Sequence, residues 1–201
     1  PDSRRYHLIL LAENQQGYQN LMKIVSSAWI EGFYTKPRVD HDLLEQYHEG
    51  LICLSACLAG EIPRALVDGE YEKAKETALW YNKVFGQGNY FLEIQDHGIE
   101  DQKRTNPEII RLSRETGIPL VATNDVHYIE KDDAEVQKIL ICIQTKHTIN
   151  ENTGFDFSSP DFYLKTGDEM AALFPEVPEA IENTNRIAER CHVTFEFGHT
   201  I

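Results

Sequence analysis

Four short apolar segments alternate with helical patterns along this chain, and this order limits its possible folds more than any other feature. Leu51–Ser55 is apolar at consecutive positions, which is typical of a strand buried on both faces of a parallel sheet. Strands that alternate with helices predict an α/β fold, namely a mostly parallel sheet or barrel with helices outside it. The predicted strands are His7–Ala12, Leu51–Ser55, Tyr90–Ile94 and Ile118–Thr123.

Capping residues mark the helices between these strands. Asn14 and Asp40 can cap the N-termini of two helices, and Gly117 follows the C-terminus of another. The predicted helices are 14–29, 40–48, 70–85, 100–116, 131–143, 167–174 and 178–191, with a polar loop at 150–160 and a short strand at 162–164. We therefore expect a strand-and-helix domain over residues 1–150 and a helical carboxyl-terminal connector over residues 151–201.

Composition excludes several classes of protein. The 33 acidic and 19 basic residues give a formal net charge of −14, and a surface of this charge repels phosphate backbones. We therefore do not expect the segment itself to be a nucleic-acid groove. Four cysteines without a Cys-x-x-Cys pair argue against a zinc knuckle and a disulfide framework. The apolar runs are too short to span a bilayer and the start lacks a signal pattern, so we expect a cytoplasmic protein without membrane contact.

The segment Ile118–Tyr128 carries the most specific chemistry, because a buried-looking strand leads directly into Asp125 and His127. Alternate residues point the same way at a strand end, so this carboxylate and imidazole are expected side by side. Functional side chains of parallel α/β folds gather at the carboxyl ends of strands, where Cys57 also falls. His7 lies at the start of the first strand or within it. Carboxylate, imidazole and thiolate together suit zinc, or a mixed site with manganese or iron.

Each of these residues also has an ordinary structural interpretation. His7 can be a core histidine, Cys57 a small buried hydrophobe, and the pair Asp125 and His127 a cap for the next helix. The functional interpretation gains weight only because all four fall near strands that should be neighbours.

Weaker candidates lie near the same strand ends. Glu93 and His97 could orient a metal ligand or contact a phosphate, although a turn residue before Gly98 is the simpler interpretation of His97. Lys36 and Arg38 could meet a phosphate, but the tripeptide Lys-Pro-Arg is weak evidence alone.

Five motifs bring a known family into view. In chain order they are GFYTKPRVD, GLICLSACLAGEIPRAL, YFLEIQDHG, IPLVATNDVHY and DFYLKTGDEMAALF. Over essentially the whole chain, this series closely resembles the PHP (polymerase and histidinol phosphatase) domain of the DnaE-type alpha subunits of bacterial DNA polymerase III.

The resemblance implies a distorted (β/α)7 barrel that carries up to three metals, zinc or manganese, and in many members a 3′–5′ exonuclease for proofreading. The metal ligands that carry over are His7, Cys57, Asp125 and His127. The family's opening HxH motif and further ligands should precede His7. The chain is therefore expected to be a partial barrel, its later part, leading through residues 151–201 toward the polymerase palm, and to be inactive alone.

Three hypotheses follow from the resemblance. The preferred one is a replicative DNA polymerase whose PHP region supports metal-assisted phosphodiester hydrolysis at a mispaired 3′ end. Its partners would be the rest of the alpha subunit, other replicase subunits, and DNA through the longer protein. The second is a scaffold that stabilises the polymerase and docks a separate proofreading subunit. The third and weakest is a stand-alone phosphoesterase acting on a small phosphate ester.

Overall fold

One four-stranded mixed sheet organises the molecule. The computed structural model describes residues 5–149, 151 and 159–198. Its strands β1 (Ile9–Ala12), β2 (Leu51–Leu54), β3 (Tyr90–Ile94) and β4 (Leu120–Ala122) are hydrogen-bonded in the order β1-β2-β3-β4. The pairs β2–β3 and β3–β4 are parallel, whereas β1 runs antiparallel to β2. The α/β class is confirmed, and two of the three strand pairs are parallel, with β1 as the exception. The seven-stranded barrel stays a prediction.

The direction of β1 follows from a tight junction between its end and the start of β2. Ala12 pairs with Leu51, and the Glu13 amide donates to the Gly50 carbonyl at 2.9 Å. A Cβ on Gly17 would lie 1.7 Å from the Gly50 carbonyl oxygen, so only glycine allows this approach. Because the end of β1 meets the start of β2, the two strands must be antiparallel.

Most helices occupy the predicted places. They are α1 (Gln15–Ile30), α2 (His41–Tyr47), α3 (Glu61–Val67), α4 (Tyr71–Phe85), α5 (Glu100–Thr116), η1 (Lys131–Asp133), α6 (Ala134–Thr145), α7 (Gly167–Leu173) and α8 (Pro178–Arg190). Asn14 caps α1 by accepting from the Gly17 amide, and Asp40 caps α2 by accepting from the Leu43 amide, both at 3.0 Å. Helix α3 was not predicted. Most of the expected polar loop at 150–160 lies outside the described residues, and the expected strand at 162–164 is a single bridge between Tyr128 and Tyr163.

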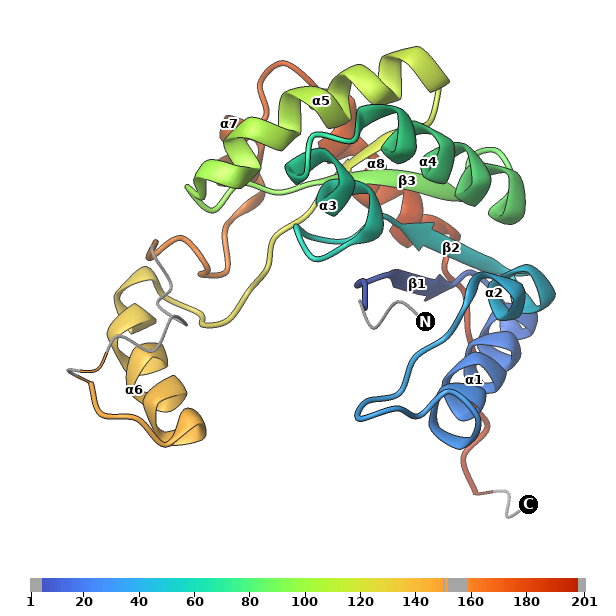
Figure 1. Ribbon diagram of the computed structural model, residues 1–201, viewed down its shortest axis with the longest axis horizontal. Coiled ribbons are helices and arrows are strands. Elements are labelled where there is room, and N and C mark those ends of the chain that lie inside the picture. Colours follow the sequence, from blue (N-terminus) through green and yellow to red (C-terminus); the bar gives the residue numbers. More distant parts are fainter. Residues whose placement is uncertain (1–4, 150, 152–158, 199–201) are drawn as a thin grey trace.

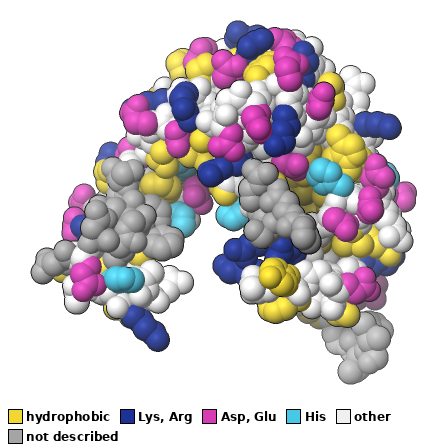
Figure 2. Space-filling view, in the orientation of Figure 1, with side chains coloured by type: hydrophobic (Ala, Val, Ile, Leu, Met, Phe, Trp, Pro, Cys, Tyr) yellow, Lys and Arg dark blue, Asp and Glu magenta, His cyan; other side chains and the backbone are white. Residues whose placement is uncertain are grey.

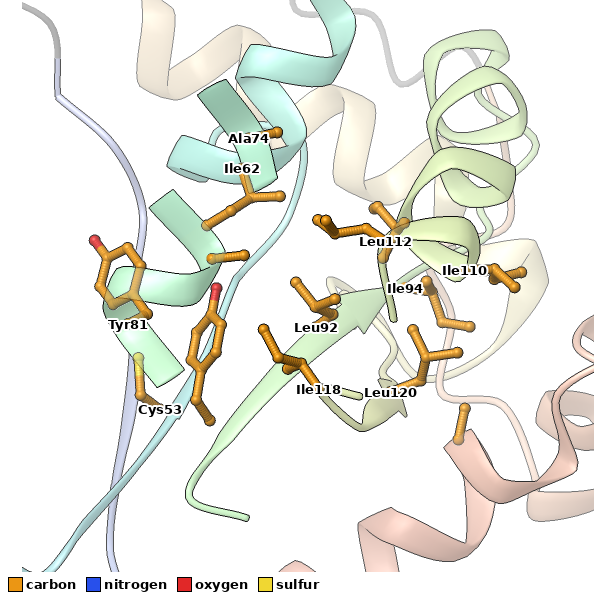
Figure 3. Close-up of a cluster of buried hydrophobic side chains, with 14 of the residues drawn as sticks. Cys53, Ile62, Ala74, Tyr81, Leu92, Ile94, Ile110, Leu112, Ile118 and Leu120 are labelled. Carbon is orange, nitrogen blue, oxygen red and sulfur yellow. The ribbon is translucent and has the colours of Figure 1, made fainter. Parts of the chain in front are cut away.

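Both faces of the sheet are covered. Leu92 and Ile94 point into a large cluster of buried side chains beneath α3, α4 and α5, as Figure 3 shows. Phe91 points to the opposite face, where it packs with Val121 and with Ile187 of α8. This alternation is the period of two expected of a strand buried on both sides. No helix in the described part of the chain is long and apolar enough to cross a membrane.

Helix α8 belongs to the packing of the sheet. The Asn183 side-chain amide donates to the Leu120 carbonyl of β4 at 2.7 Å, and Arg190 pairs with Glu13 at 2.8 Å. The proposed division at residue 150 stays a prediction, but α8 covers β4 directly.

The elements form an arch (Figure 1). The strands and helices α3, α4, α5 and α8 make its top, α1 and α2 form one limb, and α6 forms the other. Figure 2 shows the hollow between the limbs, with His side chains at its roof. The carboxyl ends of β3 and β4 lead toward this hollow (Figure 1).

Candidate metal site at the strand ends

His7 and Cys57 meet where the start of β1 lies beside the carboxyl end of β2. The Cys57 Sγ lies 3.5 Å from the His7 Nδ1. His7 precedes β1, and because β1 is antiparallel to β2 its beginning lies beside the carboxyl end of β2. The His7 amide donates to the Ala59 carbonyl at 2.9 Å, which fixes this edge. His7 is exposed, so the interpretation as a core histidine is wrong.

The turn after β2 aims Cys57 at His7. Ala56 has a positive φ of 63°, which side-chain-bearing residues rarely adopt, and it is almost fully buried. Such strained residues are frequent at functional sites. Gly60 completes the turn, because a Cβ there would lie 2.1 Å from the Ser55 carbonyl oxygen. The backbone of this loop therefore determines where the thiol points.

Burial raises the pKa of the Cys57 thiol, and the negative charges of Asp125 and Glu93 raise it further. The thiol is therefore protonated near neutral pH unless a cation compensates these charges.

Asp125 and His127 form the second pair. The Asp125 Oδ1 lies 3.3 Å from the His127 Nε2, as their alternate positions predict. Both side chains are partly exposed. They do not cap the next helix, because Glu130 and Asp133 form the capping box of η1. The structural interpretation of this pair as a cap is therefore wrong.

Among the residues that the structure describes, no group of three or more His, Cys, Asp or Glu is arranged to hold a metal ion. The chain thus presents two pairs of potential ligands rather than a closed site. Their chemistry fits zinc, which binds thiolate, imidazole and carboxylate, but a tetrahedral site needs four donors in contact. The four residues therefore have the donor types for part of such a site.

His97 is buried and supports the loop that carries Asp125. Its sequence context does not indicate this burial. Its ring is 1% exposed and stacks on Phe162, with centroids 4.4 Å apart. The His97 amide donates to the Gln102 Oε1 at 2.8 Å, so the Gln102 Nε2 faces the His97 Nδ1 at 3.1 Å as a donor. Burial lowers the pKa of His97, so the ring is neutral at neutral pH.

The Nε2 side of His97 holds the loop that carries Asp125. The Asn124 Nδ2 donates to the Tyr163 carbonyl at 2.9 Å, which turns the Asn124 Oδ1 toward the His97 Nε2 at 3.0 Å. The Asp125 amide donates to the same ring atom at 3.1 Å. His97 does precede the Gly98 turn, as the simpler interpretation held, but it also positions the residue before Asp125.

Glu93 lies deeper, between the ends of three strands. It is 5% exposed, and its Oε1 accepts from Thr123 Oγ1 and from Gln95 Nε2. Its Oε2 is buried and has no hydrogen bond within the described part of the chain. Burial raises the pKa of this carboxyl, and the charge of Asp125 adds to the effect. Glu93 is thus placed to orient other groups rather than to face solvent.

Comparison with known proteins shows which proteins this chain is similar to. The model of the PHP domain family matches residues 1–97. The DNA polymerase III subunit alpha of Treponema pallidum is 52% identical over 190 residues, which is 94% of this chain and 16% of that protein. The chain is similar to bacterial DNA polymerase III alpha subunits, and its first 97 residues match the PHP domain family.

Other relatives extend this family across bacteria. The corresponding subunit of Borreliella burgdorferi is 49% identical over 186 residues, 92% of this chain and 16% of that protein. That of Deinococcus radiodurans is 43% identical over 196 residues, 96% of this chain and 15% of that protein. The chain thus spans about one sixth of the length of the relatives that it matches, and the likeness runs along nearly all of it.

Proposed function

We propose that this chain is part of a replicative DNA polymerase III alpha subunit, a DNA-directed DNA polymerase. We further propose that His7, Cys57, Asp125 and His127 form one wall of a divalent-metal site that hydrolyses phosphodiester bonds at a mispaired 3′ end. The observation that carries the proposal is the contact between Cys57 and His7, two ligand types brought together at the edge of the sheet from distant positions.

Zinc or manganese would supply the hydrolytic chemistry, by acidifying a bound water and polarising a phosphoryl oxygen. The residues of this chain have separate tasks. Cys57 must release its proton to bind, and because its pKa is raised, a bound cation would favour that release near neutral pH. The His127 ring is held beside the Asp125 carboxylate, which favours one orientation of the imidazole. The remaining ligands would come from parts of the longer protein outside these 201 residues.

The test uses the longer polymerase that contains this chain. Asp125→Ala should lower bound metal and abolish excision of a mispaired 3′ end, while polymerisation continues. Asp132→Ala is the matched control, because Asp132 is exposed on η1 and forms no ion pair within the described residues. Normal excision after Asp125→Ala would exclude the proposed role.

A scaffold that docks other replicase subunits is the second candidate. Helix α6 favours it, because Val136, Ile139, Leu140 and Ile143 form an exposed apolar stripe along one face. The lack of a three-ligand group in the described residues also suits a structural role. On this hypothesis Cys57→Ala lowers the stability of the polymerase and leaves excision unchanged, which is opposite to the first proposal.

A further inference from the structure

A large cavity opens next to His7. It has a volume of about 980 Å³ and lies between β1, α1 and the loop over residues 31–40. Because β1 is antiparallel to β2 and α1 runs back along it, the end of α1 and this loop reach the same end of the sheet as Cys57. The cavity therefore borders the candidate metal site.

Three cations line the cavity without an ion pair among the described residues. Arg5, Lys36 and Arg38 line it, and none of them forms an ion pair with any residue that the structure describes. The acidic groups that line the same cavity form hydrogen bonds within the chain. Figure 2 shows Lys and Arg side chains gathered on the inner wall of the limb that carries α1, facing the hollow.

These acidic residues are Asp40 and Glu61. The Asp40 carboxylate caps α2. The Glu61 Oε2 accepts from Tyr81 at 3.0 Å and lies 3.1 Å from the His41 Nε2. Three cations and two carboxylates line the cavity, so its formal charge is positive, although the chain as a whole is strongly negative.

Backbone conformation and local contacts constrain the loop that carries two of these cations. Thr35 is held at a positive φ of 63°, an unusual conformation for a β-branched residue. The Arg38 Nη2 donates to the Tyr34 carbonyl at 2.8 Å, and its guanidinium lies 4.8 Å from the centre of the Tyr34 ring. A Cβ on Gly32 would lie 2.0 Å from the Arg38 carbonyl oxygen. Lys36 thus projects from a fixed, strained turn, which is typical of functional segments.

An exposed aromatic platform adjoins the cations. Trp29 lines the cavity and is 59% exposed. It stacks on Phe33, with ring centroids 5.7 Å apart and planes at 18°. A cationic groove beside exposed, rigid aromatic rings is the usual means of binding single-stranded nucleic acid, because phosphates meet the cations and bases stack on the rings.

We propose that this cavity binds single-stranded nucleic acid, with phosphates on Arg5 and Lys36 and a base on Trp29, and leads the strand toward His7. The inference rests on the proposed hydrolytic function, for which it supplies the track of the substrate strand. The net charge of the chain argued against a nucleic-acid groove, but it averages over a surface on which this cavity is a local exception.

The test measures binding of a fluorescein-labelled oligothymidylate to the longer polymerase that contains this chain, by fluorescence anisotropy. EDTA is present so that bound metal does not contribute. Lys36→Ala should weaken binding about fivefold or more and lower the slope of log K against log salt by about 0.7, the value for one phosphate contact to a single strand. Trp29→Ala should weaken binding about fivefold or more through lost stacking.

Lys138→Ala is the matched control, because Lys138 is exposed on α6, in the other limb of the arch, and its removal changes the net charge equally (Figure 1). Equal loss of binding in Lys36→Ala and Lys138→Ala would overturn the proposal, as would tighter binding of duplex than of single strand. Failure of the hydrolytic proposal can be told apart from failure of the binding proposal. If only the hydrolytic proposal fails, oligothymidylate still binds through Lys36, whereas Asp125→Ala leaves excision normal.

Discussion

The Cys57 Sγ lies 3.5 Å from the His7 Nδ1, although the two residues are 50 positions apart in the sequence. The antiparallel direction of β1 is what brings them together, since it places the beginning of β1 beside the carboxyl end of β2. If β1 ran parallel to β2, His7 would lie at the opposite end of the strands, away from Cys57. This reversal is the structural basis of the candidate metal site.

The junction that reverses β1 should be sensitive to one methyl group. Gly17→Ala would place a Cβ 1.7 Å from the Gly50 carbonyl oxygen, so the backbone must shift. We expect a loss of about 1–3 kcal/mol in the free energy of unfolding, the usual cost of overpacking. Urea unfolding followed by circular dichroism measures it. Gly167→Ala is the control, because nothing lies within 4 Å of a Cβ there, and it should change stability little.

The turn at Ala56 should discriminate between side chains by backbone conformation. Ala56→Gly relieves the positive φ of 63° and should keep or slightly raise stability. Ala56→Val places a β-branched side chain in the same conformation, and we expect a loss of about 2 kcal/mol or more. Thermal unfolding of both variants tests the sign. Equal stability of the two would show that the turn is not strained.

His97 should stabilise the loop that carries Asp125. His97→Ala removes a buried ring stacked on Phe162 and its hydrogen bonds with Gln102 and Asn124. We expect a loss of about 3 kcal/mol in the free energy of unfolding.

Hydrogen exchange of the Asp125 amide gives a local readout of the same change. It should become faster in His97→Ala than in His147→Ala, a control at an exposed position. Unchanged exchange would contradict the positioning role of His97.

Glu93 should make stability depend on pH. Its pKa is raised in the folded state, so the folded protein holds the proton more tightly than the unfolded chain does. The sign follows from linkage: stability is fully present below the unfolded pKa and falls as pH rises through the folded pKa. Glu93→Gln removes this dependence, so the variant should gain stability relative to the parent as pH rises above about 4.5.

Urea unfolding at several pH values measures the difference between Glu93→Gln and the parent. The matched control is Glu76→Gln, because Glu76 is exposed on α4. It should differ from the parent by a constant amount over the same range. A constant difference for Glu93→Gln as well would contradict the role of burial.

Local patterns predicted the elements well. Strand β2 is the buried strand that the continuous apolar character of Leu51–Ser55 indicated, and β3 has the predicted bounds Tyr90–Ile94. Asn14 and Asp40 cap the helices that they were expected to cap. Helix α3 escaped prediction because it is short and Pro63 interrupts its pattern, although a proline is tolerated in the first turn. These features depend on neighbours in sequence, which a pattern can show.

The site was predicted less completely, for a physical reason. The closeness of Asp125 and His127 follows from strand alternation and was predicted. The direction of β1 depends on the Gly17 and Gly50 contact, which no local pattern reveals, so the reason for the closeness of His7 and Cys57 was not foreseen. The burial of His97 likewise depends on Phe162, a residue far along the chain.

Zinc-edge X-ray absorption of the longer polymerase that contains this chain tests the central claim most directly. The account predicts a sulfur neighbour at about 2.3 Å from zinc that disappears in Cys57→Ser. It should persist in Cys191→Ser, a control at another free, partly buried cysteine. A spectrum without sulfur, or one whose sulfur neighbour survives in Cys57→Ser, would contradict the assignment of Cys57 and His7 to a metal site.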